Sequence, residues 1–199
     1  MKRKVTDNHL VKGRLTTVSP IRKPEDIKKI KKLLSNHKRE LLLFKLGINN
    51  GLRCGDIILI KVRDVKHLKP GEYILIKGNK TGKTFVLMMN KSVYKVLREY
   101  LDTSGLGDDD FLFKSKIGNL PITVSSINRL IKKWCRKLNI EGSYGCETLR
   151  KTFGYHQRIK YRVSWEVLCQ RFSHSSQSVT MRYLGIEDKE VKWILLKEI

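Results

Sequence analysis

Two arginines in separate parts of the chain are placed where they could hold a phosphate group. Arg53 follows a Gly-Leu bend, and Arg150 lies near the start of a segment with helical periodicity. A phosphodiester under attack gains negative charge on its non-bridging oxygens. Arginine suits these oxygens because its planar guanidinium can bind two of them and stays protonated. A single arginine is more often a surface ion-pair partner, so the hypothesis depends on the residues that accompany these two.

A tyrosine could supply the nucleophile for such a phosphate. Tyr183 follows His174 by nine residues. Its phenol, with an ordinary pKa of about 10, must lose a proton during attack and would then form a phosphotyrosyl link. The covalent link keeps the energy of the broken bond, so rejoining would need neither ATP nor a metal ion. A lone tyrosine is more often part of a core, and the hypothesis therefore rests on the histidine that precedes it.

These residues belong to four separated clusters: Gly51–Asp56 (GLRCGD), Asn79–Lys83 (NKTGK), Glu147–His156 (ETLRKTFGYH) and His174–Tyr183 (HSSQSVTMRY). In this order and at these separations they resemble the catalytic domain of the tyrosine recombinase (phage integrase) family. That family shows G-L-R-x-x-E/D, a lysine in a hairpin, H-x-L-R, and a histidine or tryptophan nine residues before a tyrosine. The resemblance covers roughly residues 20–185.

The resemblance implies a site-specific recombinase that cleaves and rejoins DNA through a 3′-phosphotyrosyl intermediate on Tyr183. It implies that Lys80, at the tip of a hairpin, protonates the leaving 5′ hydroxyl, with Lys83 as the rival candidate. Asp56 would support Arg53 or another cation, unless it is an ordinary helix surface charge. The implied catalytic set is Arg53, Lys80, Arg150, His174 and Tyr183.

One position departs from the family pattern. Glu147 stands where the family usually has the first histidine of H-x-L-R, three residues before Arg150. Two like charges about 4 Å apart cost on the order of 4 kcal/mol at an effective dielectric near 20. Glu147 is therefore protonated, paired to a cation, turned away from the phosphate, or acting as a base for Tyr183. Loss or slowing of the chemistry is the further alternative. His156 is not expected to substitute, because six residues along a helix place it on another face.

The composition favours a polyanionic partner. Lys and Arg number 42 against 19 Asp and Glu, giving a formal charge of +23, and each neutralised DNA phosphate releases counterions. We expect double-stranded DNA, contacted by Lys83, Lys151, Arg129, Lys132, Lys133 and Arg136. The last four lie on one face of a helix, where a solvated surface would look the same.

No metal or other cofactor is expected. The four cysteines are scattered, and the run Asp108–Asp110 reads as a solvated turn, because consecutive acids outside a helix point in different directions.

The apolar pattern predicts a mainly α domain with one small antiparallel sheet (α+β). Runs at 73–77 and 83–89 flank Gly78–Gly82 and predict a β-hairpin. Helical periodicity predicts helices near residues 24–36, 40–48, 52–62, 93–101, 125–138, 149–159, 165–172, 176–184 and 187–199.

The expected organisation is a basic arm or linker at 1–20, a catalytic domain at 21–185 and a C-terminal helix at 186–199. Relatives carry an N-terminal core-binding domain, so the chain is either an excised catalytic fragment or a compact recombinase. The resemblance implies a homo-tetramer on paired DNA sites, with the last helix docked on a neighbouring protomer or on its own domain, and leaves room for accessory DNA-bending proteins.

No apolar run is long enough for a membrane span, so a cytoplasmic, nucleoid-associated protein is expected. Two rival functions stay open. One is a catalytically impaired DNA-binding regulator with a recombinase fold, and the other is a type IB topoisomerase-like DNA relaxer.

Overall fold

The computed structural model describes residues 18–78, 82–186, 195 and 196. The predicted arm at 1–20 lies almost wholly outside the described residues, as does most of the predicted C-terminal helix. The described elements are α1 (Pro24–Leu33), α2 (Lys38–Asn50), α3 (Cys54–Ile57), α4 (Val62–Val65), β1 (Tyr73–Lys77), β2 (Thr84–Met88), α5 (Lys91–Ser104), α6 (Val124–Lys137), α7 (Glu147–Tyr161), α8 (Trp165–Phe172) and α9 (Gln177–Leu184). The predicted class, mainly α with a small antiparallel sheet, is confirmed.

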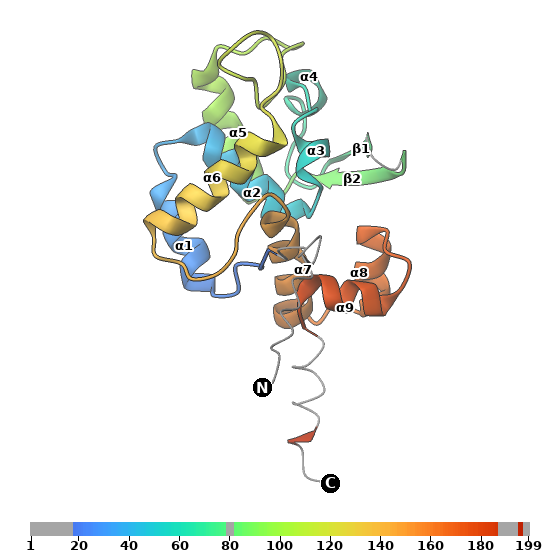
Figure 1. Ribbon diagram of the computed structural model, residues 1–199. Coiled ribbons are helices and arrows are strands. Elements are labelled where there is room, and N and C mark those ends of the chain that lie inside the picture. The colour runs from blue at the N-terminus through green and yellow to red at the C-terminus, as the bar shows by residue number, and fades with distance from the viewer. Residues whose placement is uncertain (1–17, 79–81, 187–194, 197–199) are drawn as a thin grey trace, which may run out of the picture.

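Helix α2 lies at the centre of the larger of two cores. Its sequence is apolar nearly all round, and Leu42, Leu43 and Phe44 are almost completely buried. It packs against α5 on one side and α7 on another (Figure 1). The α2–α7 contact is close because Gly47 has no side chain: a Cβ there would lie 2.7 Å from Leu149 Cδ1. The core thus fixes α7 relative to the end of α2.

A smaller core joins α8 and α9 to the other side of α7. Its buried members are Trp165, Leu168, Phe172, Leu184 and Ile186. Figure 1 shows these two helices beside α7, below the β1–β2 hairpin and apart from the main body. Helix α7 therefore belongs to both cores, and its N-terminal turn lies near their junction.

The hairpin has the predicted antiparallel pairing. Tyr73 pairs with Met88 and Lys77 with Thr84. Beyond the last pair, Gly78 N donates to Lys83 O at 2.8 Å. The tip, residues 79–81, lies outside the described residues, and with it the predicted position of Lys80.

The predicted helix at 52–62 is wrong, because two short helices, α3 and α4, replace it. Between them the chain pairs with a distant segment: Leu112 N donates to Ile60 O at 2.8 Å, and Val62 N donates to Asp110 O at 3.0 Å. Backbone groups bonded across the fold cannot also form a continuous helix.

The acids at 108–110 lie in a turn, as predicted. They also pair with cations, Asp109 with Arg63 and Asp108 with Lys66.

Candidate active site

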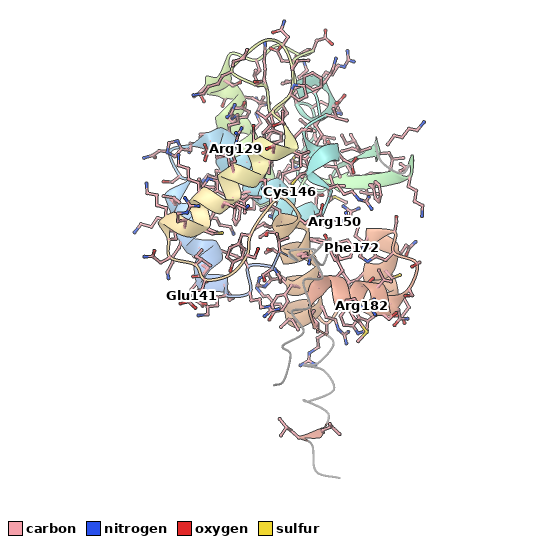
Figure 2. All side chains as sticks on the ribbon, in the orientation of Figure 1. Arg129, Glu141, Cys146, Arg150, Phe172 and Arg182 are labelled. Carbon is pink, nitrogen blue, oxygen red and sulfur yellow. The ribbon has the colours of Figure 1, made fainter. Side chains whose placement is uncertain are left out.

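The guanidinium of Arg150 ties the two cores together. Arg150 is in the first turn of α7 and only 3% exposed. Its Nη1 donates to Gly51 O at 2.5 Å, and its Nη2 donates to Phe172 O at 3.0 Å. The group also lies over the Phe172 ring, 4.6 Å from the centroid. Figure 2 labels Arg150 and Phe172 next to each other. Burial lowers the pKa of Arg150, and the nearby Arg53 acts in the same direction.

Arg53 approaches the same place from the end of α2. Helix α2 stops at Gly51, whose backbone is left-handed with φ of 60°, a conformation that favours glycine. The chain then turns through Arg53, whose extended backbone precedes α3. The Arg53 guanidinium lies 5.6 Å from the Phe85 ring centroid of β2. Its charge acts on Arg150, His174 and Tyr183, so the two predicted arginines share one site.

His174 and Tyr183 are adjacent in the fold as well as in the motif. Their ring centroids are 5.0 Å apart in an edge-to-face arrangement. His174 Nδ1 is 3.0 Å from Thr180 Oγ1 on α9. Burial, with the charges of Arg150 and Arg53, lowers the pKa of His174 to about 4. The imidazole is therefore neutral at pH 7 and can both accept and donate a hydrogen bond.

Glu147 faces the predicted nucleophile. Tyr183 Oη donates to Glu147 Oε2 at 2.5 Å, which links α9 to the first residue of α7. The carboxyl group is thus not turned away from the site, one of the alternatives left by the sequence. Burial, the charge of Glu147 and this hydrogen bond raise the pKa of Tyr183 well above its usual range, against the opposing effect of Arg150 and Arg53.

Lys151 lies beside Tyr183 inside the site, and its contact with DNA stays a prediction. It is 7% exposed, and its Nζ is 4.7 Å from the centroid of the Tyr183 ring. Burial lowers the pKa of Lys151, while the charge of Glu147, one helical turn away, raises it. His156 is elsewhere, as expected: its Nε2 is 2.9 Å from Ile21 O.

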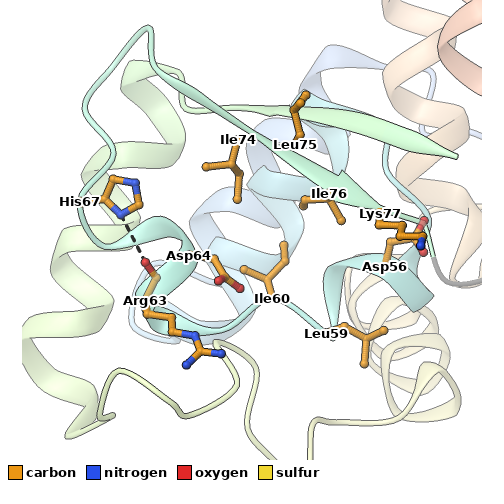
Figure 3. Close-up of a pocket in the computed structure, with 10 residues that line it drawn as sticks. All are labelled: Asp56, Leu59, Ile60, Arg63, Asp64, His67, Ile74, Leu75, Ile76 and Lys77. Carbon is orange, nitrogen blue, oxygen red and sulfur yellow. Dashed lines mark hydrogen bonds between the residues drawn. The ribbon is translucent and has the colours of Figure 1, made fainter. Parts of the chain in front are cut away.

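Asp56 is buried on α3 and acts electrostatically on Arg150. Its supporting role remains a prediction. Figure 3 shows Asp56 and Lys77 together at one end of a hollow of about 610 Å³ that lies between α3, α4 and β1. Lys83 is exposed on the hairpin.

Helix α6 has the two faces that the sequence predicts. Ile127, Ile131 and Trp134 are buried. The exposed cations are Arg129, Lys132, Lys133 and Arg136. Contact between these cations and DNA stays a prediction.

Sequence reasoning missed Arg171 on α8. Its Nε donates to Asn50 O at 3.1 Å, its Nη2 donates to the same oxygen, and its guanidinium lies over the Phe153 ring. Together with Arg150 it joins the end of α2 to α8. Nothing in the local pattern separates Arg171 from an ordinary polar residue of an amphipathic helix, so only the packing of α8 could find it.

Within residues 18–78, 82–186, 195 and 196, no cluster of histidine, cysteine or acidic side chains has the arrangement of a metal site. In the same part of the chain, no helix combines the length and apolar character that crossing a bilayer requires.

Comparisons with known proteins show which family the chain belongs to. Residues 23–190 match the model of the phage integrase family. The chain is 35% identical over 174 residues to a probable integrase/recombinase, YoeC, of Bacillus subtilis, covering 86% of this chain and 91% of that protein. It is 27% identical to a tyrosine recombinase of Pseudothermotoga lettingae, over 84% of this chain and 56% of that one. The chain thus spans nearly all of the first relative and about half of the second.

Solved structures show the same fold. The crystal structure of XerA recombinase superposes with a TM-score of 0.71 at 23% identity, over 88% of this chain and 64% of that chain. XerH site-specific recombinase bound to a palindromic difH substrate superposes with a TM-score of 0.67 at 21% identity, over 80% of this chain and 47% of that chain. A convergent cluster of arginines, histidine and tyrosine on this fold, together with the family match, places the chain in the phage integrase family of tyrosine recombinases.

Proposed function

We propose that this chain cuts and rejoins DNA strands at specific sites, with Tyr183 as the nucleophile. The observation that carries the proposal is the convergence of buried Arg150 with the partly exposed Arg53 and His174 near the Tyr183 phenol. Fixed cations beside a nucleophile suit a reaction in which negative charge grows on phosphate oxygens. Site-specific recombination is also the activity that the sequence relatives and structural neighbours support.

In the proposed reaction the phenol oxygen attacks phosphorus and the bond to the 5′ oxygen breaks. Arg53 and Arg150 bind the non-bridging oxygens, and neutral His174 donates a hydrogen bond to one of them. Lys80 gives a proton to the leaving 5′ oxygen. The strand then stays attached to Tyr183 through its 3′ phosphate until a 5′ hydroxyl reverses the same steps.

The proposed partner is double-stranded DNA. The exposed α6 cations and Lys83 would contact its backbone, which makes binding strongly salt-dependent. By the family resemblance, two DNA sites would be held by a homo-tetramer, with accessory DNA-bending proteins as further components. A nucleoid-associated, cytoplasmic location follows from that role.

Nicked suicide duplexes of randomised sequence test the proposal, because loss of a short leaving strand traps a covalent adduct. We expect wild-type protein to form a DNA-linked band on a subset of sequences and Tyr183→Phe to form none. A band with wild-type yield in Tyr183→Phe would exclude Tyr183 as the nucleophile. Absence of a band on every sequence would favour a DNA-binding regulator. Relaxation of any supercoiled plasmid would favour a topoisomerase-like activity.

A further inference from the structure

The Tyr183 hydroxyl has a single hydrogen-bond partner in the described part of the chain. That partner is Glu147 Oε2, at 2.5 Å. The phenol must lose its proton when it attacks phosphorus, and the acceptor must lie within about 2.6–3.2 Å or be reached through one water molecule. Glu147 meets this requirement directly.

The neighbouring groups are less suited to take the proton. His174 meets Tyr183 ring edge to ring face, and its Nδ1 is engaged by Thr180. Lys151 lies over the face of the phenol ring, 4.7 Å from its centroid, and not at the oxygen. Arg150 has both terminal nitrogens bonded to backbone carbonyls and carries no acceptor atom. Geometry therefore leaves the carboxylate as the acceptor.

We infer that Glu147 is the catalytic proton acceptor of Tyr183, a role that rests on the proposed strand-cleavage function. The O–H bond of Tyr183 breaks, and its proton passes to Glu147 Oε2. The phenol oxygen forms the bond to phosphorus, and the departing 5′ oxygen takes a proton from the general acid. In the reverse step the carboxylic acid returns its proton to the phenol oxygen as the phosphotyrosyl bond breaks.

The transfer also removes the charge conflict raised by the sequence. The proposed role requires Glu147 to be a carboxylate before attack, and its charge acts on the cations Arg150 and Lys151. The ionisable groups on which it acts, or that act on the phenol with it, are Arg53, Cys54, Cys146, Arg150, Lys151, His174 and Tyr183. After it has taken the proton, Glu147 is a neutral acid that can donate a hydrogen bond to the phosphotyrosyl group. The carboxyl group is thus uncharged while phosphate charge is at its greatest.

Glu147→Gln separates the proton-acceptor role from mere contact. Glutamine keeps the shape and can accept the phenol hydrogen bond, but it cannot hold the proton. General-base catalysis typically contributes about 10²–10⁴-fold, so we expect Glu147→Gln to form the covalent adduct more slowly by about that factor. The matched control is Glu141→Gln, an exposed residue of the loop before α7, which should react at the wild-type rate.

Fluorinated tyrosine at position 183 distinguishes a loss of proton transfer from a structural defect. Fluorine lowers the phenol pKa, so less help is needed to remove the proton. We expect it to restore much of the rate of Glu147→Gln while changing the wild-type rate little. Glu147→His should cleave DNA faster than Glu147→Gln. Its rate should fall as the pH drops below about 6–7, where histidine takes up a proton. Thermal unfolding of each variant shows whether the fold is kept. The pH dependence of the fluorine NMR signal gives the pKa of the phenol at position 183. This pKa should be lower in Glu147→Gln, because Glu147 raises it in the wild type.

The outcomes are distinguishable. A wild-type adduct together with an unchanged rate in Glu147→Gln would overturn the role of Glu147 and leave strand cleavage standing. If Glu147→Gln forms the adduct slowly and fluorinated tyrosine does not raise that rate, the acceptor role is also overturned, because the defect would then be structural. Absence of a wild-type adduct on all DNA would remove the proposed function, and the acceptor role with it. An unchanged fluorine titration would show that the contact does not exist in solution.

Discussion

Replacing Arg150 by lysine tests whether one buried guanidinium holds the site together. The wild-type group bonds Gly51 O on one side and Phe172 O on the other. A lysine ammonium is a compact charge on a flexible stem and lacks the planar fork that spans both carbonyls. One carbonyl then stays buried without its donor. A lost hydrogen bond to a charged group costs about 1.5–3 kcal/mol, and a buried unsatisfied carbonyl about 1–3 kcal/mol.

These two costs overlap, so we expect the free energy of unfolding to fall by about 2–4 kcal/mol in Arg150→Lys. For a chain of this size, that corresponds to a decrease in Tm of roughly 5–15 °C. The control is Arg98→Lys, whose exposed side chain lies 3.8 Å from Asp102. Its stability should change by less than about 0.5 kcal/mol. Thermal and urea unfolding measure both variants.

Adduct formation should fall in Arg150→Lys as well, measured below the Tm of the variant. Loss of one positioned donor to a developing oxyanion typically costs about 10²–10³-fold in rate. If Arg150→Lys unfolds at the wild-type temperature, the two carbonyl contacts do not hold the cores together.

Two further predictions concern packing and protonation. Gly154→Ala would place a Cβ 2.6 Å from Phe172 Cζ, and overpacking should lower the free energy of unfolding by about 1–3 kcal/mol, reduced by the helix preference of alanine. Gly55→Ala, whose Cβ would have its nearest neighbour at 4.0 Å, should be neutral, and equal urea midpoints for the two variants would contradict the packing argument. Because the pKa of His174 is about 4 in the fold against 6.5 ordinarily, the unfolded chain takes up the proton first. The free energy of unfolding should therefore fall as the pH drops from about 6.5 to 4. This pH dependence should be absent in His174→Gln. If the variant and the wild type lose stability equally over this range, His174 is not the cause.

Much of the fold could be predicted because local pattern and tertiary packing agree. Helix α8 begins and ends at the predicted residues, and α5 and α6 bury the apolar faces that their spacing indicates. The hairpin follows from two β-rich runs around a glycine-bounded turn. The prediction of one helix at 52–62 was wrong because the backbone there forms hydrogen bonds with residues 110 and 112, which no local pattern reveals.

The candidate site was predictable in its members but not in its contacts. The motif spacing indicated Arg53, Arg150, His174 and Tyr183. The sequence left several alternatives for Glu147, because its contact with Tyr183 depends on how α9 packs against α7. The position of Lys151 over the Tyr183 ring depends on the same packing, which no local pattern shows.

The division of the site between two cores has a consequence for stability. Arg53 follows α2 of the large core and Arg150 lies on α7, which both cores share. His174 and Tyr183 belong to the α8–α9 segment, whose core has few buried residues. Segments with fewer buried apolar contacts open at lower free energy than the rest of a fold. We therefore expect α8–α9 to open before the main body in urea.

Two tryptophans can report this order separately. Trp165 is in the small core and Trp134 in the large one, where its Nε1 donates to Glu40 Oε2 at 2.8 Å. Two variants each keep one of these tryptophans, with the other and Trp193 replaced by phenylalanine. The fluorescence of Trp165 should change at a lower urea concentration than that of Trp134. Adduct formation should be lost at the urea concentration where the Trp165 signal changes. Coincident transitions would mean that Arg150 and Arg171 couple the two cores into one cooperative unit. In that case substitution of either arginine should separate the transitions, since these side chains bond the end of α2 to α8.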